Sequence, residues 1–211
     1  MSRIIEKVTA FVTRNSEDGH DLLLFEHPNA GIQIPAGTVE DNETPEEAAI
    51  REATEETGLK SLSISRYLGY AEDKLPEGHR IIVEPTRVYA RPDATSFDWA
   101  YLRKGIAVKL NRESCEFSQV TYEELDRVPN PQYVTMCITG WVPNDVLTDM
   151  RKRYFFHLEF HGRSERSWTV FTDNHRFSLF WAPLTDLPEI IHPQDEWLEF
   201  LRKHFHSLMP R

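Results

Sequence analysis

The chain has 211 residues, 40% of them hydrophobic and 11% aromatic, so it is long and apolar enough to bury a core. Its formal net charge of −10 and the lack of a basic run argue against a nucleic-acid backbone as its partner. No segment resembles a signal peptide or a membrane span, and we expect a cytoplasmic protein with no membrane contact. Cys115 and Cys137 are too few for a disulfide framework, and we expect two reduced, partly buried thiols.

The first part of the chain predicts mainly β-structure. Segments 4–13 and 21–26 are rich in strand-forming residues and flank turn residues 15–19, a pattern typical of a β-hairpin. A short strand is expected at 32–34. A further strand is expected at 61–70, after an intervening loop and helix.

The helix between these strands carries strong end signals. Thr44 is a good N-cap, Pro45 suits the first helical position, and Glu47 completes a capping box. Gly58 supplies the left-handed residue that ends a helix. The sequence therefore predicts a helix over residues 45–57.

The middle segment, 77–150, is too long for a connecting loop. Its apolar alternation predicts several strands, at 80–89, 105–110, 116–122 and 133–138. After it, strands are expected at 154–160, 167–172 and 177–182. A final helix is expected at 194–208, where the apolar residues recur at helical spacing.

The helix at 45–57 has an unusual acidic face. Glu52, Glu55 and Glu56 stand at relative positions 0, +3 and +4, where like charges repel by a few tenths of a kcal/mol per pair. They also crowd the last turn, where the helix dipole disfavours acids by about 0.3–1 kcal/mol each. A bound cation explains the arrangement, and three carboxylates suit Mg²⁺ or Mn²⁺.

The spacing around these acids resembles the Nudix box. The matching residues are Gly37, Glu43, Arg51, Glu52, Ala53, Glu55, Glu56, Gly58 and Leu59. Seven positions of fixed type coincide by chance on the order of once in 10⁸ windows. The preceding residues 33–36 also look like the strand and turn that lead into the box in that family. The alternative is that residues 45–57 form an ordinary solvated acidic helix that carries no functional site.

The resemblance implies an α+β fold, a Nudix-type α/β/α sandwich with a mixed β-sheet. On this interpretation residues 1–76 and 151–211 form the Nudix domain, and a β-rich insertion, 77–150, interrupts it. We expect the insertion to select substrates, bordering their pocket, or to form a dimer contact. A decorative surface lobe is the alternative, because insertions are tolerated at exposed loops.

Members of the Nudix family cleave a diphosphate bond, usually in a nucleoside diphosphate linked to another group. The resemblance implies that Glu52, Glu55 and Glu56 bind Mg²⁺ or Mn²⁺ together with the backbone carbonyl of Gly37. Glu52 is a ligand, the general base, or both. The expected partner is a small nucleoside diphosphate derivative, with a homodimer possible.

Arg51 is the cation of the box, and it is expected among the catalytic residues with Glu52. Its bland role is an i, i+4 pair with Glu47. Its functional role is to hold the box loop through Glu43 or to orient the acids. Glu43 and Gly58 are expected to be structural.

A further acid is expected from the strand at 154–160. His157, Glu159 and His161 share one face of it by alternation. A solvated outer face is the bland interpretation, and Glu159 directed at the metals is the functional one. The rival to the enzyme as a whole is a catalytically silent Nudix-fold ligand sensor or scaffold.

Overall fold

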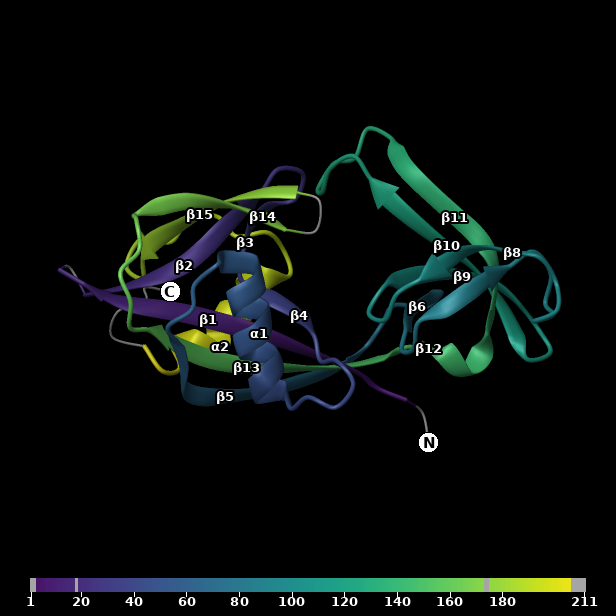
Figure 1. The fold of residues 1–211 in the computed structure, drawn as a ribbon, viewed down its shortest axis with the longest axis horizontal. Coiled ribbons are helices and arrows are strands. Elements are labelled where there is room, and N and C mark those ends of the chain that lie inside the picture. The colour runs from purple at the N-terminus through teal and green to yellow at the C-terminus, as the bar shows by residue number, and fades with distance from the viewer. Residues whose placement is uncertain (1–2, 18, 173–174, 206–211) are drawn as a thin grey trace. The chain divides into compact units, whose positions relative to one another are not determined.

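The computed structural model describes residues 3–17, 19–172 and 175–205, which form two compact units (Figure 1). One unit, here called the α/β unit, comprises residues 7–71 and 153–211. The other, here called the β unit, comprises residues 1–6 and 72–152. The boundary between them falls within three strands, β1, β5 and β13.

The α/β unit is built on an eight-stranded sheet. Its strands lie in the order β14, β15, β2, β1, β13 and β5, while β3 pairs with β2 and β4 pairs with β1. Their bounds are β1 Ile5–Ser16, β2 Gly19–His27, β3 Gly31–Gln33, β4 Ala36–Thr38, β5 Leu62–Lys74, β13 Met150–Phe160, β14 Ser167–Thr172 and β15 His175–Pro183. The short strand β4 lies antiparallel to β1, with Gly37 opposite Val8.

Helix α1 spans Pro45–Thr57 and covers one face of this sheet. Its capping box is complete, because Glu47 N–H donates to Thr44 Oγ1 at 3.2 Å and Thr44 N–H donates to Glu47 Oε2 at 2.8 Å. Gly58 ends it with φ of 73°. The buried face of α1 is formed by small residues that allow a close approach to the sheet, including Ala48, Ala49 and Ala53.

Helix α2 spans Gln194–Arg202 and covers the opposite face of the sheet. Leu198 and Leu201 pack there against a second core that contains Phe11 and Phe155. Helices on both faces of one sheet confirm the expected α+β sandwich. The helix is shorter than expected, and residues 206–208 of the prediction lie outside the described residues.

The β unit contains a seven-stranded sheet in the order β12, β6, β9, β10, β11, β7 and β8. The bounds are β6 His79–Ile82, β7 Thr86–Tyr89, β8 Asp98–Leu102, β9 Ala107–Ser114, β10 Phe117–Leu125, β11 Val134–Pro143 and β12 Leu147–Thr148, with a 3₁₀ turn at Asn144–Val146. Valines and leucines of these strands form its core, among them Val88, Leu102 and Val142.

Several details of this unit differ from expectation. The expected strand 80–89 is two strands, because the chain bends at 83–84 and Pro85 has no amide hydrogen for a ladder. Strand β8 was not expected at all. Both cysteines are exposed free thiols, so the expectation of partial burial is wrong. Within the described ranges, no helix is long and apolar enough to cross a membrane.

Candidate active site

The site is assembled by strand β4 and helix α1. Strand pairing with β1 holds β4 at the edge of the first core, and α1 packs across that core on its alanine face. The loop between β4 and α1 carries Glu43, and Glu52 and Glu56 of α1 face back toward β4. Backbone pairing therefore places residues from the loop and the helix at one short strand.

Glu52 is fitted closely against Gly37. The amide of Thr38 donates to Glu52 Oε1 at 3.1 Å. A Cβ atom on Gly37 would lie 1.9 Å from Glu52 Cδ and 2.0 Å from its Oε1, far inside van der Waals contact. Only glycine therefore allows the Glu52 carboxylate to occupy this place.

Glu56 binds the residue that precedes Gly37. Its Oε2 accepts a hydrogen bond from the amide of Ala36 at 3.0 Å. Two carboxylates of one helix thus accept from the amides immediately before and after Gly37. The two hydrogen bonds bring both side chains to the same three-residue strand.

Arg51 connects the loop, the strand and the helix. It binds Glu43 with Nε and Nη2 at 3.0 and 2.7 Å, and it donates to the carbonyl of Thr38 at 3.0 Å. Its Nη1 lies 3.0 Å from Glu52 Oε1 and 3.2 Å from Glu55 Oε2. Glu47 is instead engaged in the helix cap, so the geometry favours the loop-holding role of Arg51 over the i, i+4 pair.

The electrostatics of the site follow from burial. Desolvation raises the pKa of Glu52, and the opposing attraction of Arg51 and the Thr38 amide is smaller. Hydrogen bonding to Glu43 raises the pKa of Arg51, so this guanidinium stays charged. The Glu52 carboxylate is therefore a better proton acceptor than an exposed glutamate.

The donor set suits a hard divalent cation. Carboxylate oxygens and a backbone carbonyl are the ligands that Mg²⁺ and Mn²⁺ prefer. Glu52 and Glu55 already converge on one positively charged group, the Nη1 of Arg51. In the described part of the chain, however, no three side chains of Asp, Glu, His or Cys stand in metal-binding geometry. The residues thus fit a cation by chemistry, with Glu55 directed at Arg51.

Glu159 is not brought together with these residues. Phe156 and Leu158 of β13 pack in the core beneath α1, whereas Phe155 packs in the core beneath α2. By alternation Glu159 shares the α2 face, where its Oε1 accepts from Ser65 at 2.8 Å. The expectation that it faces the box glutamates does not agree with this geometry.

His157, on that same face, is not solvated. It is 1% exposed, its Nε2 lies 2.8 Å from Thr13 Oγ1, and its ring packs against His204 and Phe205. Desolvation lowers its pKa to about 4. The alternative expectation, a solvated strand face, is wrong at this position, because His204 and Phe205 after α2 cover His157.

Two further residues reach the site only through the fold. Lys7 lies opposite Thr38 on β1 and donates to Thr38 Oγ1 at 2.6 Å. Trp168 of β14 donates its indole N–H to the carbonyl of Thr57, at the acidic end of α1, at 2.8 Å. No sequence signal marks either residue, since strand pairing and packing bring them here.

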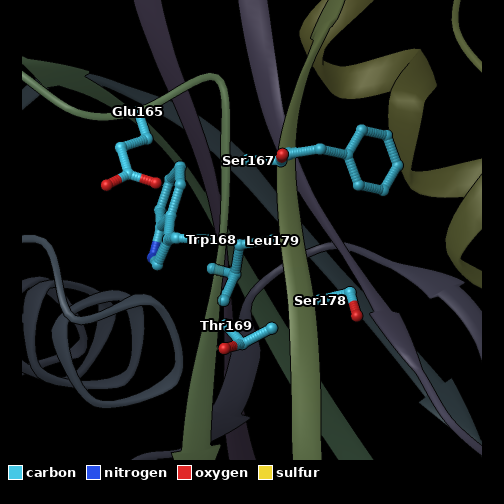
Figure 2. Close-up of a pocket in the computed structure, with 7 residues that line it drawn as sticks. Glu165, Ser167, Trp168, Thr169, Ser178 and Leu179 are labelled. Atoms are coloured by element: carbon cyan, nitrogen blue, oxygen red, sulfur yellow. The ribbon is translucent and has the colours of Figure 1, made fainter.

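Trp168 also borders an open cavity of about 570 Å³ along the β14–β15 hairpin. Figure 2 shows the carboxylate of Glu165 beside the Trp168 indole, with Leu179 next to them. The remaining lining residues are Ser167, Thr169, Ser178 and Phe180. The cavity therefore lies in the α/β unit, next to the end of the helix that carries the acids.

Comparison with known proteins identifies the family. The family model described as the NUDIX domain matches residues 6–136. The chain belongs to the NUDIX domain family. This match includes the whole box and confirms the resemblance recognised in the sequence. It also extends through most of the segment expected to be an insertion.

One relative of this NUDIX chain is the Bacillus subtilis protein named putative 8-oxo-dGTP diphosphatase YtkD. It is 49% identical over 51 residues, which are 24% of this chain and 32% of that protein. The aligned segment thus spans about a third of the relative's length.

Several solved structures resemble the chain. The Nudix hydrolase RenU from M. smegmatis has a TM-score of 0.46 at 12% identity, covering 96% of this chain and 87% of that one. The NUDIX domain of Shewanella oneidensis NrtR, solved with ADP ribose, has a TM-score of 0.47 at 11% identity. The match covers 97% of this chain and 90% of that one. The C. elegans Ap4A hydrolase has a TM-score of 0.42 at 15% identity, and the match covers 98% of this chain and 99% of that one.

Proposed function

We propose that this protein is a metal-dependent hydrolase that cleaves the diphosphate bond of a nucleoside diphosphate linked to another group. The observation that carries the proposal is the pair of carboxylates, Glu52 and Glu56, held by the amides on either side of Gly37. A helix kept only for stability would not gather acids at its carboxyl end. Family membership supports the same chemistry.

Glu52, Glu55, Glu56 and the carbonyl of Gly37 would hold Mg²⁺ or Mn²⁺. A bound divalent ion neutralises phosphate oxygens and lowers the pKa of water. Arg51 acts as a positioning residue, because it ties the loop and β4 to the helix. Glu52 is the proposed general base: its Oε1 is held by Thr38 and Arg51, and its Oε2 receives the proton of the attacking water.

The substrate is a small nucleotide. The name of the B. subtilis relative makes 8-oxo-dGTP the first compound to assay, although the aligned segment covers only a part of either chain. Nucleotide sugars, ADP-ribose, NADH, dinucleoside polyphosphates and ordinary nucleoside triphosphates complete the panel. We also propose that the protein acts in the cytoplasm, where its two exposed thiols stay reduced.

The experiment is to assay this panel with Mg²⁺, Mn²⁺ or EDTA and to identify the products. Glu52→Gln and Glu56→Gln are compared with Glu46→Gln, an exposed acid on the first turn of the same helix. We expect divalent-dependent cleavage that both box variants lose and the control retains. Binding of a panel compound without turnover in any metal would overturn the proposal in favour of a ligand sensor.

The β unit is proposed to contribute substrate choice or a dimer contact, because box chemistry needs only the diphosphate. Its own core and sheet support a folded role beyond that of a connection. Replacing residues 77–150 by a short Gly/Ser linker tests this. A folded variant with unchanged substrate ranking and unchanged oligomeric state would contradict the proposal.

A further inference from the structure

A row of four aromatic rings, here called the aromatic stack, runs from the core of the α/β unit to its surface. The rings of Phe25 and Phe177 are stacked with their centroids 4.7 Å apart, and both side chains are buried. The ring of His27 lies 5.2 Å from that of Phe177, and the ring of His175 lies 4.7 Å from that of His27. Both histidines are half-buried, so the stack ends in two imidazoles that solvent reaches.

The two imidazoles keep polar atoms available for a ligand. Asn29 N–H donates to His27 Nδ1 at 3.0 Å, so Nε2 carries the proton of the neutral ring. Within the described ranges, no residue accepts a hydrogen bond from His27 Nε2 or bonds to a ring nitrogen of His175. The two rings meet at 56°, so a planar group can stack on one ring while its edge faces the other.

The aromatic stack lies on the same face of the sheet as the acidic helix. Phe25 and Phe177 belong to the core that also contains the alanines of α1. At the carboxyl end of α1, a Cβ atom on Gly58 would lie 3.5 Å from Cγ2 of Val170, the residue opposite Phe177. Glu56 precedes Gly58 by two residues. The helix end that carries the acids therefore contacts the strand next to the stack.

The separation between the acids and the imidazoles suits a nucleotide. His27 is on β2 and Val170 is on β14, with β15 between these two strands. Adjacent strands are about 4.8 Å apart, so two strand spacings, roughly 10 Å, separate the end of α1 from His27. The phosphates and the base of an extended nucleotide are a similar distance apart. A diphosphate at the acids thus allows the base to lie against the imidazoles.

We propose that His27 and His175 bind the nucleobase of the substrate and contribute to the choice among nucleotides. The identity of this ligand rests on the proposed hydrolase function. Burial, and then the neighbouring His175, lower the pKa of His27, so its ring is uncharged at pH 7. A neutral imidazole can stack on a base and donate its Nε2–H to an acceptor on the base edge. It has no charge with which to attract a phosphate.

The test is an NMR titration of the imidazole signals of the full chain in the presence of Mg²⁺. GMP, AMP, CMP and UMP are the probes, because they have no diphosphate bond to cleave, and ribose 5-phosphate is the base-free comparison. His27→Ala removes the ring, whereas His27→Phe keeps a stacking surface and removes the donor. His175→Ala is a milder variant, because its ring contacts only His27 among the described rings. The matched control is His79→Ala, an exposed histidine of the β unit.

We expect at least one nucleoside monophosphate to shift the signals of His27 and His175, and ribose 5-phosphate to leave them unchanged. His27→Ala and His175→Ala should each weaken this binding about ten-fold, His27→Phe less, and His79→Ala not at all. Equal shifts with ribose 5-phosphate would assign the pair to a phosphate and overturn the proposal. Unchanged signals with every probe would also overturn it, since the stack would then only close the core.

The outcome separates this inference from the proposed hydrolase function. Cleavage of a nucleotide by a chain whose imidazole signals respond to no probe would refute the base site alone. Base binding at His27 and His175 without cleavage in any metal would refute the hydrolase function alone.

Discussion

Arg51 and Glu43 form a two-pronged ion pair, with Nε and Nη2 of the arginine 3.0 and 2.7 Å from the two carboxylate oxygens. The pair joins the loop before α1 to the middle of that helix, eight residues further along the chain. The same guanidinium donates to Thr38 of β4. One side chain therefore fixes the position of the strand that carries Gly37.

Replacing Arg51 by Lys tests this linkage. Lysine keeps the charge but cannot form both hydrogen bonds to Glu43 together with the one to Thr38. We expect a loss of about 1–3 kcal/mol in the free energy of unfolding, measured by urea denaturation. Glu43→Gln should lower the free energy of unfolding less in the Arg51→Lys background than in the wild type. Equal costs in both backgrounds would show that the pair is not coupled.

Gly37→Ala is expected to destabilise the fold, because its Cβ would lie 1.9 Å from Glu52 Cδ. Relief of this clash requires displacement of the carboxylate or of β4, at about 1–3 kcal/mol. In a Glu52→Ala background the clash is absent, and the same substitution should be nearly neutral. Urea denaturation of the four proteins in metal-free buffer measures the difference. The idea fails if Gly37→Ala costs the same in both backgrounds.

Glu56→Gln keeps the volume and the acceptor oxygen for Ala36 but removes a charge. We expect kcat to fall at least ~100-fold, comparable to loss of a major electrostatic contribution. In metal-free buffer the melting temperature should be unchanged or higher, because a like charge at the helix end is removed. Steady-state kinetics and a thermal melt measure the two effects. Near-wild-type turnover would remove Glu56 from the site.

Millimolar Mg²⁺ or Mn²⁺ is expected to raise the melting temperature, since an ion that binds only the native state stabilises it. Glu52→Gln and Glu56→Gln should abolish the shift, and Glu46→Gln should retain it. Differential scanning calorimetry with metal and with EDTA provides the comparison. Superimposable curves for the wild type in the two buffers would argue against the metal site.

Because His157 is buried with a lowered pKa, we expect the free energy of unfolding to depend on pH. Burial is the largest cause that lowers its pKa, and the nearby positive charges of His204, His20 and Arg66 lower it further. Glu159 opposes them, and the pKa is about 4. The unfolded chain, with a histidine pKa of about 6.5, therefore binds more protons between pH 4 and 6.5.

The contribution of His157 to the free energy of unfolding is therefore fully present above pH 6.5. It declines as the pH falls toward 4, by roughly 3 kcal/mol in total. His157→Gln should flatten the part of the stability–pH curve that lies in this window. Urea denaturation at pH 4.5, 5.5 and 7.0 measures the slope. An equally steep loss in the variant would assign the acid sensitivity to other groups.

Local chemistry determined much of this protein. The capping box and Gly58 place α1 at the residues expected from sequence, because helix ends depend on neighbouring residues alone. The box spacing identified the family for the same reason, since its acids lie within one helix. The alternating segments of the α/β unit also became strands close to their expected bounds.

Tertiary structure decided what depends on distant partners. Strand β8 pairs with β7 in the part of the chain that the structure describes, and its aromatic residues Trp99 and Tyr101 are exposed, so the strand depends on its partner and not on burial of an apolar face. Glu159 and His157 lie on the α2 face of the sheet, and only the docking of α2 shows what covers that face. The pairing of Arg51 with Glu43 and not with Glu47 likewise required the folded loop, because the sequence left both partners open.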